Sequence, residues 1–165
     1  MYGKLCRALL LLLLGLSLPA AAEDFGIVYE PPPGWIALAS DPGRAFYAPD
    51  LPAGGILQVA VWPADRLDGD SFRTWFGRQV AASGFPAPEA NEAQEGSTRG
   101  LQILELRRSV SDATAGSLSI RFYGFSSDAR AGIAVMMTNR TELTDGLRTA
   151  VQTFFDSLKF TSAEP

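Results

Sequence analysis

The sequence predicts an α+β fold: an antiparallel sheet of about six strands flanked by two main helices, in the order β-β-β-α-β-β-β-α. Several short segments are apolar at every second position or at nearly every position, which is typical of strands. Two longer segments repeat apolar residues every three or four positions, as one face of a helix does. Strands that are apolar on both faces must be covered on both faces, so we expect helices and loops to sandwich the sheet.

A hairpin in the second half of the chain gives the clearest strand signal. Residues 117–125 begin with strict alternation, which places Leu118, Ile120 and Phe122 on one face. A polar turn follows, and residues 132–137 are then apolar throughout. The second strand of this hairpin is therefore expected at the centre of the sheet.

A helix is predicted from Glu142 to Lys159. Acidic residues stand in its first turn and Lys159 in its last, as the helix dipole favours. One stripe along it is apolar and predicts a face that docks on the sheet: Leu143, Leu147, Ala150, Val151, Phe154 and Leu158.

The first half of the chain alternates between extended segments and turns. Three strands are expected before the first helix: a short one at residues 25–29, a second segment that starts at 35–38 and resumes at 45–48, and a third strand at 56–62 that is apolar enough to be central. Asp41-Pro42-Gly43 predicts a turn within the second segment.

A second helix is predicted over residues 71–83, with Asp70 as its N-cap and Gly84 as the glycine that ends it. A Pro/Ala/Glu-rich connector at residues 85–96 is expected to be mobile and on the surface. A strand over residues 101–108 then leads to the hairpin.

Residues 1–22 have the pattern of a cleaved signal peptide. Lys4 and Arg7 precede an apolar run at residues 8–18, and Ala20-Ala21-Ala22 offers a small-residue cleavage site. The run is too short to span a bilayer comfortably, so we expect no stable membrane insertion after cleavage. We therefore expect a periplasmic or secreted protein whose residues 23–165 form a single domain.

The charge balance opposes nucleic-acid binding. The chain has 18 acidic and 14 basic residues, a net charge of −4, and removal of the signal peptide takes away two of the basic residues. Such a chain repels nucleic acid and anionic membrane surfaces. The expected partner is an unknown envelope protein or a small ligand.

The residue types narrow the available chemistry. The sequence contains no His and a single cysteine, Cys6, which lies in the predicted signal peptide. Histidine-dependent catalysis and ordinary zinc sites are therefore excluded. No phosphate-binding glycine motif occurs. The acidic loop from Asp65 to Asp70 could offer oxygens to calcium, but capping and solvation explain it without metal. We predict no catalytic residue, no metal and no cofactor.

Five residues are candidates for binding a ligand or partner. Arg107 and Arg121 lie on neighbouring predicted strands, where they could hold an anion by bidentate contacts. The alternative is cross-strand ion pairing with Glu105. The aromatic candidates are Trp35, Tyr47 and Trp62, because aromatic side chains are enriched in binding surfaces; a role in the core is the alternative for at least two of them.

The element order, together with two motifs, resembles the PsbP-like superfamily. Pro33-Gly34-Trp35 opens the sheet, and residues 154–160, Phe-Phe-Asp-Ser-Leu-Lys-Phe, close the chain. The similarity covers nearly all of residues 25–160 and is greatest to the exported bacterial members. It implies an α/β/α sandwich and non-enzymatic accessory or binding work, as in a photosystem II extrinsic subunit, a Ran GTPase-binding protein and envelope lipoproteins. No functional residue carries over from such different activities.

These observations together predict a non-enzymatic exported envelope protein with an accessory or binding role. The alternative is a carboxylate-dependent hydrolase acting on envelope material, which the surplus of Asp and Glu suggests.

Overall fold

The computed structural model describes residues 25–161, so the predicted signal peptide lies outside the described residues. The two helices are α2 (Phe72–Ala82) and α3 (Asp145–Ser157). The strands are β1 (Ile27–Val28), β2 (Ile36–Ala39), β3 (Arg44–Tyr47), β4 (Leu57–Val61), β5 (Asp65–Arg66), β6 (Gln94–Thr98), β7 (Leu101–Asp112), β8 (Gly116–Ser127), β9 (Arg130–Thr138) and β10 (Lys159–Phe160).

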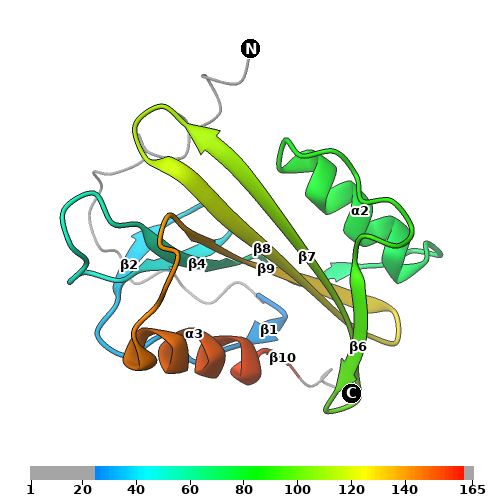
Figure 1. Ribbon diagram of the computed structural model, residues 1–165. Helices are drawn as coiled ribbons and strands as arrows, with labels where there is room; N and C mark the ends of the chain where they lie inside the picture. The colour runs from blue at the N-terminus through cyan, green and yellow to red at the C-terminus, as the bar shows by residue number, and fades with distance from the viewer. Residues whose placement is uncertain (1–24, 162–165) are drawn as a thin grey trace.

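One large sheet dominates the structure (Figure 1). Its strand order is β2-β3-β4-β9-β8-β7-β6, and β5 pairs with β9 beyond the end of β4. A separate two-stranded sheet joins β1 to β10. Every pairing between these strands is antiparallel, which confirms the predicted fold class.

The two helices lie on opposite faces of the sheet, and each covers its own core. Val151, Phe154 and Phe155 of α3 pack in one core. Trp75, Phe76 and Val80 of α2 pack in the other. Neighbouring residues of β8 alternate between the two cores, with Phe122 under α2 and Phe125 under α3. This arrangement confirms that the sheet is covered on both sides.

The two strands that are apolar on both faces are central, as predicted. β9 stands in the middle of the sheet, between β4 and β8. Along β9, Ile133 belongs to the α2 core and Ala134 to the α3 core. In β4, Val59 and Val61 are fully buried.

The predicted strand number and element order are wrong in detail. Five strands precede α2, four lie between the helices, and β10 follows α3. The Asp41–Gly43 turn reverses the chain fully, so β2 and β3 form a hairpin. Pro63, which has no N–H to donate, falls between β4 and β5.

Part of the predicted connector is a strand. Residues 94–98 pair with β7 as the edge strand β6, which its polar sequence did not indicate. Phe85 packs on Phe122 with ring centroids 5.4 Å apart, and Ala93 is buried. The connector therefore packs against the α2 side of the sheet.

Both helices begin at different residues from those predicted. Ser71, not Asp70, is the N-cap of α2 and accepts a hydrogen bond from the Thr74 N–H, while Asp70 pairs with Arg78. Thr144 caps α3 and so moves its start beyond Glu142. Gly84 follows α2 with a φ of 85°, as its predicted role requires.

The end of α3 is also earlier than predicted. The helix ends at Ser157, and Lys159 is in the extended strand β10, opposite Val28. Pairing with β1 supplies the backbone hydrogen bonds that a further helical turn would have made.

We expect Val151→Asp to abolish cooperative unfolding, because Val151 is buried in the α3 core and an unpaired carboxylate there costs at least about 3 kcal/mol. Thr153→Asp, at an exposed position of the same helix, is the control and should change stability by about 0.5 kcal/mol or less. Urea denaturation followed by circular dichroism measures both. Equal midpoints for the two variants would contradict the assigned face of α3.

Candidate functional site

The predicted site residues fall in three places. Arg107 and Arg121 lie together on the α3 face of the sheet. Trp35 packs against the α3 core at the start of β2. Tyr47 and Trp62 lie on the α2 face. The structure therefore does not bring the five candidates into one site.

The two arginines share one carboxylate. They are directly opposite each other in the β7–β8 register. Arg107 donates from Nε and Nη2 to Glu105 Oε1 at 3.0 and 2.9 Å, and Arg121 donates from Nη2 to Oε2 at 2.6 Å. Glu105 thus occupies both guanidinium groups, and an anionic ligand would have to displace it. The ion-pair interpretation describes this geometry.

Arg121 is held on its other sides by aromatic rings. Its Cζ lies 4.9 Å from the ring centroid of Phe155 on α3 and 5.7 Å from that of Tyr123. Its side chain is only 20% exposed and that of Glu105 is 16% exposed. The Nε atom of Arg121 is buried and has no hydrogen-bond partner within the described part of the chain. Sequence reasoning did not identify the aromatic rings, since they come from two separate elements.

The acidic loop is occupied by contacts within the protein. Asp65 Oδ2 accepts a hydrogen bond from Trp75 Nε1 at 2.9 Å, and Asp70 pairs with Arg78 at 2.5 Å. Among residues 25–161, no group of three or more His, Cys, Asp or Glu side chains is placed to hold a metal ion. No helix in that range is long and apolar enough to cross a membrane.

Tyr47 and Trp62 belong to a larger surface on the α2 face. In the register of the sheet, Ile36, Tyr47, Gln58 and Met137 stand side by side in one row across four strands. Leu38, Ala45, Ala60 and Val135 form the next row. Beyond these, Trp62 lies against Gly43, where an added Cβ would come within 3.2 Å of its Nε1.

Helix α2 packs on β8 and β9 and leaves the β2 end of this face accessible. Exposure rises in that direction: Ile120 of β8 is buried, Met137, Gln58 and Tyr47 are half-buried, and Ile36 is 43% exposed. We call the residues Ile36, Leu38, Tyr47, Gln58, Trp62, Val135 and Met137 the β2–β4 surface.

The β2–β4 surface carries no charged side chain. Arg44, the one charged residue of β2 to β4, is on the other face, with its Cζ 5.6 Å from the ring centroid of Phe25. Uncharged surfaces with aromatic residues are typical of the cores of protein interfaces. Tyr47 and Trp62 are thus placed where a partner could contact them, whereas Trp35 is on the opposite face.

The two edges of the large sheet differ in how they are protected. All five residues of β6 are exposed and polar or glycine, and its Glu95 is bound by Arg73 of α2. The other edge, β2, has the sequence Ile-Ala-Leu-Ala, and β3 is its one strand neighbour among the described strands. An uncharged edge strand presents unpaired backbone groups that can bind another strand.

Comparison with known proteins supports the fold but identifies no family. No family model matches the chain, and no curated protein does. A crystal structure from Bacteroides thetaiotaomicron VPI-5482 is similar, with a TM-score of 0.57 and 9% sequence identity. The match covers 84% of this chain and 46% of that one, so this chain spans about half the length of the similar protein. At this identity the similarity shows the fold alone, and membership of the PsbP-like superfamily stays a prediction.

Removal of Glu105 should destabilise the protein far more than removal of Arg107. Glu105→Ala leaves Arg121 largely buried without its partner, which we expect to cost about 3 kcal/mol. Arg107→Ala removes a side chain that is 74% exposed and should cost less than about 1 kcal/mol. Urea denaturation of both variants measures the difference. Similar losses would show that Arg121 does not depend on Glu105.

The tyrosine hydroxyls should make the fold sensitive to alkaline pH. Burial raises the pKa of Tyr123 above its ordinary value of 10.0, although the charge of Arg121 opposes this, and burial also raises the pKa of Tyr29. The folded state therefore holds these protons more tightly than the unfolded state. The contribution of the two protonated hydroxyls to the free energy of unfolding is complete below pH 10 and is lost as the pH rises through the higher pKa values of the folded state. Tyr123→Phe should weaken the alkaline fall in the urea midpoint; parallel curves for the variant and the parent would contradict the assignment.

Proposed function

We propose that this protein is a non-enzymatic binding protein of the bacterial envelope. In this proposal, residues 1–22 direct export, and residues 23–165 act in the periplasm or outside the cell. The partner is a protein that contributes an extended, uncharged segment, which pairs with the outer edge of β2. Its side chains extend onto the β2–β4 surface.

The observation that carries the proposal is the contrast between the two edges of the sheet. β6 is polar and anchored to α2 through Glu95 and Arg73, features that discourage strand addition. β2 has no charged residue and continues into a row of half-buried apolar side chains. Main-chain hydrogen bonds then supply affinity, and contacts with Ile36, Tyr47 and Trp62 supply specificity.

The arrangement of carboxylates does not favour the alternative of a hydrolase. Glu92, Glu95 and Glu105 are each bound to an arginine. The pKa of Glu92 is lowered by hydrogen bonds from the Glu89 N–H and from Arg108, which is the opposite of what a general acid needs. In this proposal the arginine pair is structural: Arg121 joins β8 to β7 through Glu105 and contacts Phe155 of α3, and Arg107 adds a more exposed contact to Glu105.

Ile36→Lys should abolish partner binding without unfolding the protein. The Ile36 side chain is 43% exposed, so a lysine fits there, but its charge obstructs the addition of an uncharged strand. Val28→Lys is a matched control, since Val28 is 42% exposed and lies in the separate β1–β10 sheet.

The measurement is photo-crosslinking in intact cells from a probe at the exposed Ala37, with the crosslinked peptide identified by mass spectrometry. We expect one dominant crosslinked peptide, from an uncharged segment of the partner. This crosslink should disappear in Ile36→Lys and persist in Val28→Lys. Amide exchange of β2 should slow when the purified partner is added. Capture that persists in Ile36→Lys, or slowed exchange in β6 instead of β2, would refute this mode of binding.

A further inference from the structure

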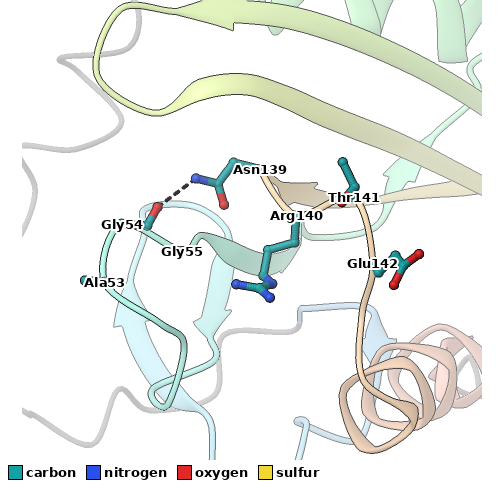
Figure 2. A pocket seen from close by; sticks show the side chains of 7 residues that line it. All are labelled: Ala53, Gly54, Gly55, Asn139, Arg140, Thr141 and Glu142. Carbon is teal, nitrogen blue, oxygen red and sulfur yellow. Dashed lines mark hydrogen bonds between the residues drawn. The ribbon is translucent and has the colours of Figure 1, made fainter.

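An open, solvent-facing cavity of about 430 Å³ lies at one end of the sheet, between residues 53–55 and residues 139–142 (Figure 2). The first segment connects β3 to β4, and the second leads from β9 towards α3. This volume is within the range of small-molecule sites. None of the candidates identified from the sequence lines it.

Arg140 extends into this cavity (Figure 2), and its guanidinium has no partner among residues 25–161. Every other arginine in residues 25–161 has its guanidinium in contact with a carboxylate or a backbone carbonyl. For Arg140 only the backbone N–H has such a partner, the Thr138 hydroxyl oxygen. Glu142, two residues further on, also lines the cavity, and its carboxylate is directed away from Arg140 (Figure 2). The chain has 18 acidic residues, so a shortage of carboxylates does not explain the free arginine.

The backbone beside Arg140 is held firmly. Asn139 donates from Nδ2 to the carbonyl oxygens of Gly54 at 2.7 Å and Ala115 at 3.2 Å, and its Oδ1 accepts from the Ile56 N–H at 2.7 Å. The Arg140 N–H donates to Thr138 Oγ1 at 3.1 Å. These bonds fix both walls of the cavity relative to each other, and such preorganisation lowers the entropic cost of binding.

The opposite wall consists mainly of backbone. The Gly55 N–H donates to the Pro52 carbonyl oxygen at 2.7 Å and closes a tight turn. A Cβ at position 55 would come within 2.9 Å of Leu51 Cβ and of the Pro52 carbonyl oxygen, so this turn requires glycine. The lining is mainly polar, with peptide groups on this wall and Thr141 on the wall that carries Arg140, so the cavity suits a small charged molecule better than an apolar one.

We propose that this cavity binds a small oxyanion, a molecule carrying a carboxylate or phosphate group, with Arg140 as the residue that contacts the anion. A guanidinium donates two parallel hydrogen bonds to either group. This site is separate from the β2–β4 surface and goes beyond the binding role proposed for it.

The test is a nuclear magnetic resonance titration of the full mature chain with sodium phosphate and, separately, with sodium succinate. Sodium chloride at matched ionic strength controls for screening. We expect saturable shifts of the backbone amides of Gly54, Gly55, Arg140 and Thr141. Shifts with phosphate alone assign a phosphate-bearing ligand, and shifts with succinate assign a carboxylate. No saturable shift with either salt, or equal shifts with chloride, would overturn the proposal.

Variants test the role of Arg140 directly. Arg140→Gln should weaken binding by at least about tenfold, because the charged contact is lost. Arg140→Lys keeps the charge without the two-pronged geometry and should retain part of the affinity. Arg66→Gln, at an exposed arginine outside the cavity, should bind as the parent does. Full affinity in Arg140→Gln would overturn the assignment.

Discussion

The structure depends on one constraint: the central strand β9 is apolar on both faces and must be buried on both. Ile133 and Ala134, neighbours in sequence, enter different cores. Each core needs its own cover, and the two helices supply it from opposite sides. The positions of α2 and α3, the neighbouring strands β4 and β8, and the alternation of Phe122 and Phe125 all follow from this requirement.

The cover on the α2 side is incomplete, and this leaves the β2–β4 surface partly accessible. Helix α2 has 11 residues and packs on β8 and β9, so it does not extend over β2 and β3. Aromatic and aliphatic side chains fill the remaining area without charge. The same sheet ends at the edge strand β2, whose own four residues are uncharged. A surface and an edge of this kind together are suited to a partner that adds a strand.

Arginine in this chain mainly fixes structure. Arg121 ties β7 and β8 to α3 through Glu105 and Phe155, Arg108 holds the connector through Glu92, and Arg130 binds the Thr161 carbonyl oxygen near the end of the described chain. In an acidic protein these pairs also keep carboxylates occupied. Among the arginines of residues 25–161, Arg140 is the exception, because its guanidinium contacts no carboxylate or carbonyl there and lines a cavity.

The sequence by itself determined the fold class, the central strands and the apolar faces of both helices, because burial of a strand or helix face imposes a regular spacing of apolar residues along the sequence. It also placed Arg107 and Arg121 beside Glu105, since neighbouring strands bring such residues together. Tertiary structure alone decided the rest. The edge strand β6 is polar, and β10 has two residues at the end of what the sequence predicted to be a helix, so only pairing defines these two strands. The separation of Trp35 from Tyr47 and Trp62 depends on the register of the strands. The Arg140 cavity forms where two distant segments meet: Ile56 and Asn139, which are hydrogen-bonded beside it, are 83 residues apart. No local sequence pattern predicts a contact at that separation.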